Sequence, residues 1–322
     1  MKSPFWLLAS GSWLLLHASV DGVVMNATTG KPQPSVVISL VQPGSRGMQT
    51  LASVKSDAEG KFKIDKEFPP GPALLQGLHQ GATYNLMLTP GAPTNGLRLN
   101  VYDSTSKPAA AKVEQHMVLI EPSASALQVS ETLLCKNDTN TTYQDPSKGS
   151  VQFYLPQGAD GKVQVTINAP GGMPIQRPAE KTSQPGVYKV NYPLKPGETR
   201  FDINYALPAS DTFAAKNLNP DSPTRLVTPS SVTLSGDTIN GLGQEPQTKA
   251  HIYDVLKPAY EVKIEGTGSL RNPETPAADE DTGAPQVEQQ PARIYSRLWW
   301  VLGLALGILA LGGTMLYRKG TV

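Results

Sequence analysis

Apolar and polar residues alternate with a period of two in many short stretches between residues 19 and 270. Such alternation puts the apolar side chains on one face of an extended strand and the polar ones on the other. No stretch before residue 298 keeps a helical period, so the pattern predicts an all-β fold. The apolar positions that alternate are Phe62 and Ile64; Tyr84, Leu86 and Leu88; Leu97, Leu99 and Val101; Val151, Phe153 and Leu155; Val163, Val165 and Ile167; Phe201, Ile203 and Tyr205; and Tyr260, Val262 and Ile264.

Turn-forming pairs separate these stretches, and they account for much of the high content of 29 Gly and 29 Pro. Short strands at such spacing are typical of antiparallel β-sandwiches. A Ser-Thr-Ser-Lys-Pro-Ala-Ala-Ala segment at residues 104–111 interrupts the strands. We therefore expect two antiparallel β-sandwich domains, residues 19–105 and 106–270. The turn pairs include Pro43-Gly44, Glu59-Gly60, Pro70-Gly71, Pro90-Gly91, Asn95-Gly96, Asp160-Gly161, Gly171-Gly172 and Pro196-Gly197.

The first 18 residues have the features of a secretory signal peptide. Lys2 precedes an apolar run from Phe5 to Leu16, which is too short to span a membrane, and small residues follow it. We expect cleavage after Ala18 and export of the chain that follows.

Residues 298–317 carry no charge over 20 positions, a length that matches the hydrocarbon core of a bilayer. Trp299 and Trp300 at one end and Tyr317 at the other suit the two membrane interfaces. The segment predicts a single transmembrane helix with a cytoplasmic tail of residues 318–322. Within it, Gly303 and Gly307 have the small-xxx-small spacing that favours close helix contact, either in a dimer or with another membrane subunit.

Residues 271–297 contain four prolines and five acidic residues without apolar periodicity, which predicts a disordered stalk. The expected protein is thus a single-pass membrane protein with its N-terminal ectodomain outside the cytoplasm, on the periplasmic side if the cell has two membranes.

The first sandwich resembles carboxypeptidase regulatory-like domains, which are transthyretin-like members of the carbohydrate-binding-like fold group. The resemblance covers roughly residues 20–90 and rests on two phrases, the Thr-Gly-x-Pro turn at 29–32 and Ser-Asp-x-x-Gly-x-Phe at 56–62, with Ser56 in place of the usual Thr. Independently of the family, Gly30 and Gly60 permit turn conformations and Asp57 can bond its own turn. The residues that form this fold motif are Gly22, Gly30, Pro32, Asp57, Gly60 and Phe62.

The histidines and the single cysteine do not form a catalytic or metal-binding pattern. His79, His116 and His251 are far apart, and none begins the His-x-x-Glu pair of a metallocarboxypeptidase. His116 is expected on a strand face. Cys135 ends an expected strand, where a buried thiol and an intermolecular disulfide are the alternatives. The sequons at Asn26, Asn137 and Asn140 are expected to be unmodified turn residues of a bacterial envelope protein.

The formal net charge of +1 and the lack of a basic stripe argue against a nucleic-acid partner. No enzyme, cofactor or metal is expected. The sequence favours a membrane-anchored interaction or scaffold protein whose partners are other envelope or membrane proteins. The alternative is a carbohydrate-binding envelope protein, although all four Trp lie outside residues 19–297, which leaves Tyr and Phe to stack on a sugar.

Overall fold

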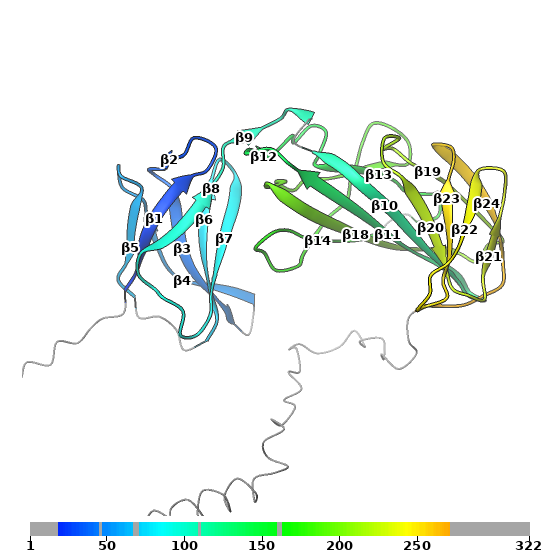
Figure 1. Cartoon of the computed structure of the whole chain (residues 1–322), viewed down its shortest axis with the longest axis horizontal. Coiled ribbons are helices and arrows are strands. Elements are labelled where there is room, and N and C mark those ends of the chain that lie inside the picture. Colours follow the sequence, from blue (N-terminus) through cyan, green and yellow to red (C-terminus); the bar gives the residue numbers. More distant parts are fainter. Residues whose placement is uncertain (1–18, 45–46, 67–70, 109–110, 160–162, 271–322) are drawn as a thin grey trace, which may run out of the picture. The chain divides into compact units, whose positions relative to one another are not determined.

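A computed structural model describes residues 19–44, 47–66, 71–108, 111–159 and 163–270 (Figure 1). The chain divides into a compact unit of residues 1–275 and a second of 276–322, and every described residue belongs to the first. The predicted signal peptide, stalk, transmembrane helix and tail lie outside the described residues, as do Gly303 and Gly307. The part of the chain that the structure describes contains no helix long and apolar enough to cross a membrane.

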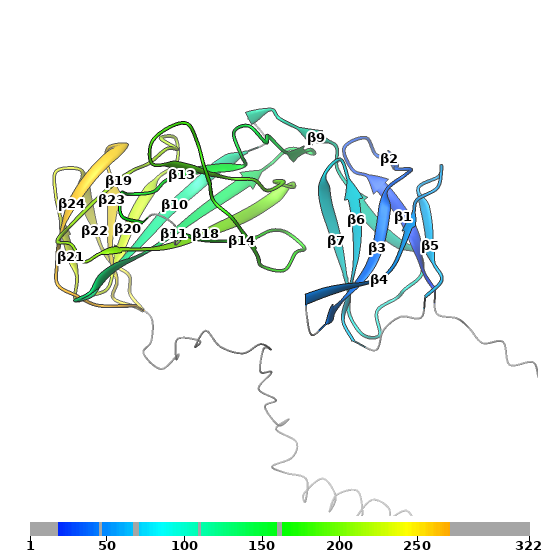
Figure 2. The ribbon, with the colours of Figure 1, turned by 180° about the vertical axis from the view of Figure 1, so that it is seen from behind.

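The N-terminal module, which we define as strands β1 to β8, consists of two sheets that share one apolar core (Figure 2). One sheet has the order β2-β1-β5, with β8 beside β1, and the other has the order β4-β3-β6-β7. Both sheets contribute fully buried side chains to the core, such as Val24 of β1 and Leu75 of β6. The strands are β1 (Val20–Asn26), β2 (Lys31–Pro32), β3 (Val37–Gly44), β4 (Gly47–Lys55), β5 (Lys61–Ile64), β6 (Ala73–His79), β7 (Ala82–Leu88) and β8 (Leu97–Val101).

The C-terminal module, strands β10 to β24, is organised around a sheet with the order β15-β14-β18-β11-β10-β20-β23-β22. Two three-stranded sheets, β13-β17-β16 and β19-β24-β21, share its apolar core. Its strands are β10 (Lys112–Pro122), β11 (Ala126–Asn137), β12 (Thr142–Tyr143), β13 (Val151–Tyr154), β14 (Gln164–Asn168), β15 (Ile175–Arg177), β16 (Glu180–Lys181), β17 (Val187–Val190), β18 (Gly197–Pro208), β19 (Thr212–Lys216), β20 (Thr224–Thr228), β21 (Thr233–Ser235), β22 (Ile239–Gln244), β23 (His251–Val255) and β24 (Ala259–Glu265). Strand β9 (Ser104–Thr105) lies between the modules in sequence and pairs with β12.

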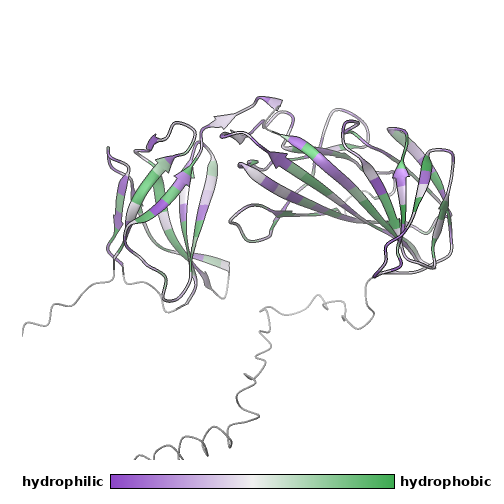
Figure 3. Cartoon of the chain, viewed as in Figure 1, coloured by the Kyte–Doolittle hydropathy of each residue, from purple (hydrophilic) through white to green (hydrophobic). Residues whose placement is uncertain are grey.

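The period-two alternation of the sequence appears directly as burial. Along β24, Tyr260, Val262 and Ile264 are buried and the residues between them are exposed. Figure 3 shows the same alternation as bands of hydrophobic and hydrophilic colour along the strands. The expected all-β class is therefore confirmed for the described residues.

Most strand pairs are antiparallel, but three are parallel: β1 with β8, β9 with β12, and β10 with β20. Gly22 permits the first of these, because a Cβ atom at this position would lie 2.1 Å from the carbonyl oxygen of Leu97. The expected antiparallel pairing is confirmed for most strands, and these three pairs depart from it, since alternation reports the faces of a strand and not the direction of its neighbour.

A buried polar cluster links four strands of the large sheet, β10, β11, β18 and β20. The Glu131 Oε2 atom lies 3.0 Å from His116 Nε2, and the hydroxyl of Tyr205 donates to Oε1 at 2.6 Å. His116 Nδ1 lies 3.3 Å from the hydroxyl of Thr224. All four side chains are buried, so each polar atom of the cluster depends on the others in place of water.

The last described residues are attached to the end of β10. Buried Glu121 accepts hydrogen bonds from the Ser269 hydroxyl at 2.6 Å and from the backbone N–H of Leu270 at 2.7 Å. The N–H of Gly268 donates to the carbonyl of Pro122 at 3.0 Å. The chain therefore leaves the described fold at a fixed point.

Candidate functional site

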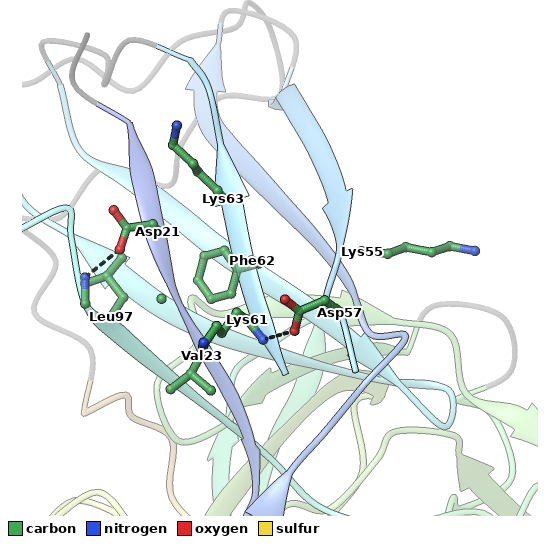
Figure 4. A pocket seen from close by; sticks show the side chains of 10 residues that line it. Asp21, Val23, Lys55, Asp57, Lys61, Phe62, Lys63 and Leu97 are labelled. Carbon is green, nitrogen blue, oxygen red and sulfur yellow. Dashed lines mark hydrogen bonds between the residues drawn. The ribbon is translucent and has the colours of Figure 1, made fainter. Parts of the chain in front are cut away.

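A hollow of about 530 Å³ opens on the N-terminal module between residues of β1, β5, the end of β4 and the start of β8 (Figure 4). Its volume lies in the range of small-molecule sites. Three residues of the fold motif line it, namely Gly22, Asp57 and Phe62. The motif and the hollow therefore coincide in space.

Each of these three residues also has a structural role. Gly22 pairs with Phe62 on one side and with Leu97 on the other. Phe62 is only 5% exposed and belongs to the apolar core. Asp57 accepts hydrogen bonds from the backbone N–H groups of Lys61 at 2.7 Å and Glu59 at 3.0 Å, and so closes the turn before β5.

The remaining motif residues shape turns beside the hollow. Gly30 and Gly60 have φ angles of +72° and +73°, which favour glycine. A Cβ atom at Gly60 would also lie 2.7 Å from the carbonyl oxygen of Val24. Pro32 pairs with Met25 in the short β1–β2 ladder. Each residue of the fold motif therefore has a role in building this part of the fold.

The hollow is lined by charges of both signs, namely Lys55, Lys61 and Lys63 and the carboxylates of Asp21 and Asp57. A 2.7 Å ion pair with Asp65 raises the pKa of Lys63. Asp21 accepts the backbone N–H of Gly96 at 3.0 Å. The mixed charge of the lining does not favour an anion, and among its described side chains there is no Ser, Cys or His that could act as a nucleophile or base.

Two further hollows lie on the C-terminal module, and sequence reasoning did not find them. One, of about 520 Å³, is lined by Tyr154, Lys216 and the segment between β16 and β17. The other, of about 310 Å³, is lined by Lys148, Lys189 and part of the same segment. Residues 148 to 216 approach one another only through folding, so no local sequence pattern marks them.

The three histidines among the described residues have structural partners. His79 Nε2 lies 3.3 Å from Asp103 Oδ1, and His116 belongs to the buried polar cluster as a strand-face residue. His251 Nδ1 lies 3.0 Å from the carbonyl oxygen of Val232. Among the described residues no group of three or more His, Cys, Asp or Glu side chains could hold a metal ion.

Cys135 is a free, buried thiol on β11, only 2% exposed. Burial raises its pKa to about 12. The thiol is therefore protonated and shielded, which makes it unsuitable as a nucleophile.

Two of the three sequon asparagines, Asn26 and Asn137, use their side chains inside the fold. Asn26 and Asn137 are each 2% exposed, and each accepts the backbone N–H two residues on, at 2.9 Å from Thr28 and 3.0 Å from Thr139. Asn137 also donates to the carbonyls of Thr141 and Leu194. The Asn-x-Thr pattern here makes Asx turns, in agreement with the expectation of turn residues.

No family model and no curated protein matches the chain. Among solved structures, the chain is similar to the M1 zinc metallopeptidase from Deinococcus radiodurans, at 13% identity over 48% of this chain and 42% of that one, with a TM-score of 0.26. A mutant of that enzyme bound to a peptide substrate gives 0.28 at the same identity and coverage. The match spans less than half of the metallopeptidase, and likenesses this low carry no argument about fold family or activity.

Proposed function

We propose that this chain is a non-enzymatic, membrane-anchored extracytoplasmic interaction or scaffold protein that presents its β-modules to envelope partners. The carboxypeptidase regulatory-like resemblance, the division at residues 105 and 106 into two β-sandwich domains, and the anchor at residues 298–317 are parts of this proposal. A scaffold protein binds its partners through its surface. The proposal therefore needs a surface that suits a partner.

The observation that carries the proposal is the outer edge of β4. This strand has nine residues, and within the described part of the chain no strand pairs with it on the side away from β3. It contains no proline, and its one charge is Lys55 at the end. Edge strands are usually protected by charges, prolines or bulges, because an open edge pairs readily with another chain. β4 has one bulge, at Leu51 opposite the step from Leu40 to Val41, but no proline and no internal charge protects its outer edge, so this edge suits a partner that adds a strand.

Site-specific crosslinking in the native membrane tests this proposal. A photoreactive residue in place of Gln49, on the exposed part of β4, should give one discrete crosslinked protein. A second substitution, Thr50→Lys, should abolish the product, because a charge on the edge opposes strand addition.

Gln128→Lys is the matched control, since Gln128 is exposed on β11, which has neighbours on both sides. It should leave the crosslink unchanged. The scaffold proposal fails if no crosslinked protein forms at β4, or if both lysine variants reduce it equally.

The second candidate function is carbohydrate binding in the envelope. Half-buried Tyr154 lines the 520 Å³ hollow, and aromatic rings in such positions are common in sugar sites. A glycan panel tested on the purified full-length protein would decide this candidate, and loss of binding on Tyr154→Ala would localise it.

A further inference from the structure

The paired hollows of the C-terminal module have the composition of a binding site for a charged chain. They adjoin at the shared lining residues Lys181 to Gln184, and we call the two hollows together the depression. Their lysines come from four separate stretches of sequence: Lys148, Lys181, Lys189 and Lys216. Among the described residues that line both hollows, none is acidic. Just outside the lining, Glu180 forms a 3.6 Å ion pair with Lys189. The other three lysines still give the depression a positive charge, so it attracts anions.

Two of these lysines lie against aromatic rings. The Lys216 Nζ atom is 5.3 Å from the centre of the Tyr154 ring, and the Lys181 Nζ atom is 5.9 Å from that of Tyr188. An ammonium group over an aromatic face is stabilised by the ring and holds its charge at a defined place. Lys189 is fixed differently, by donating to the carbonyl of Pro146 at 2.6 Å.

Gly186 supports this arrangement. Its φ is +73°, and a Cβ atom there would come within 2.6 Å of Cε2 of Tyr154. The ring can therefore lie against the backbone only because this position has no side chain.

Neutral hydrogen-bonding groups complete the lining. Gln157 and Gln184 offer amides and Ser183 offers a hydroxyl, while the hydroxyl of Thr182 donates to the carbonyl of Val187 at 2.9 Å. Amides and hydroxyls both donate and accept, as the hydroxyl groups of a sugar require. The described lining contains no arginine, the residue that best fits planar bidentate phosphate recognition.

We propose that this depression binds a carboxylated saccharide chain of the uronate type, with Lys216 and Lys148 contacting its carboxylates and Tyr154 and the amides contacting its sugar rings. This inference rests on the carbohydrate-binding alternative and is independent of the edge of β4.

Titration of the purified full-length protein with fluorescent oligogalacturonate tests the site. Binding is expected to weaken about fivefold on Lys216→Gln, and similarly on Lys148→Gln, because each removes one ammonium at a solvent-facing position worth about 1 kcal/mol. Both side chains are exposed, so neither change should affect folding. Lys55→Gln, on the rim of the N-terminal hollow, is the matched control and should change the Kd less than twofold.

The choice of ligands separates the alternatives. The methyl-esterified form of the same oligosaccharide should bind at least tenfold more weakly, and raised salt should weaken the acidic form. Equal binding of both forms would overturn the role of charge. Polyglutamate that binds as tightly, with the same dependence on Lys216, would identify an acidic peptide and overturn the saccharide.

Two further results distinguish a failure of the proposed uronate site from a failure of the carbohydrate-binding function as a whole. Glycan binding that is indifferent to Lys216 and Lys148 would overturn this site but keep the broader function. Absence of binding to every glycan would overturn both, while the crosslink at β4 could still stand.

Discussion

The buried cluster of His116, Glu131 and Tyr205 allows the energetic role of one hydroxyl to be measured. In Tyr205→Phe the ring is kept and the only loss is the 2.6 Å hydrogen bond to Glu131 Oε1. Glu131 is 3% exposed, so water does not replace the lost donor. Removing the donor from a buried acceptor costs about 1–3 kcal/mol, towards the upper end for a carboxylate acceptor. We expect the free energy of unfolding to fall by about 1.5–3 kcal/mol.

For a module of this size the change corresponds to a Tm lower by about 3–12 °C. Urea unfolding of the full-length protein, followed by far-UV circular dichroism, gives the free energy directly. This readout is appropriate because the tryptophans, Trp6, Trp13, Trp299 and Trp300, all lie outside the described residues. The urea m-value should not change, because the same surface is exposed on unfolding.

Tyr102→Phe is the matched control, since the described residues supply no hydrogen-bond partner to its hydroxyl, and its cost should stay below about 0.5 kcal/mol. In a Glu131→Leu background, Tyr205→Phe should cost much less than in the natural protein, because the acceptor is gone. Equal costs for the two Tyr→Phe changes, or full additivity with Glu131→Leu, would refute the reasoning.

Three further predictions concern other parts of the fold. Gly22→Ala should destabilise the protein by at least about 3 kcal/mol, because its Cβ would meet the Leu97 carbonyl, whereas Gly241→Ala, with open space around it, should change stability by less than about 1 kcal/mol in the same urea assay. Burial lowers the pKa of Lys195 to about 8 from 10.5, so the unfolded chain holds more protons between these values and stability rises with pH there. Lys195→Met should remove that rise. Near pH 7 the variant should have a free energy of unfolding about 3 kcal/mol higher than the natural protein, and this difference should narrow by pH 9.5. A difference that stays constant with pH would contradict the prediction. Cys135, with a pKa of about 12, should resist iodoacetamide at pH 8 in the native protein and react fully in urea; native labelling at the unfolded rate would show the thiol to be accessible.

Strand positions could be predicted from the sequence because burial of one strand face makes apolar and polar residues alternate locally. Phe62, Val165 and Val262 all occupy the buried faces that alternation assigned to them. Strand partners could not be predicted in this way. The parallel pairing of β10 with β20 joins residues more than 100 positions apart, and neither strand differs in pattern from an antiparallel one.

The two sites also show that only locally determined features could be predicted from the sequence. The fold motif led to the N-terminal hollow because Gly22, Asp57 and Phe62 are needed locally for its turn and strand pairing. The depression of the C-terminal module had no such signal. Lys148 and Lys216 are ordinary exposed lysines in the sequence, and only the packing of β13, β17 and β19 brings them to one surface.

The attachment of residues 268–270 to the end of β10 has a mechanical consequence. A pull on the chain beyond Leu270 would first load the hydrogen bonds to Glu121 and Pro122. β10 lies inside the large sheet, between β11 and β20, so the force would spread into strands held on both sides. The strand pairs β21–β24 and β19–β24 would carry no load until the hydrogen bonds from residues 268–270 to Glu121 and Pro122 broke. In force spectroscopy, Glu121→Ala should therefore lower the force of the first rupture and leave the later unfolding force of the sheet unchanged.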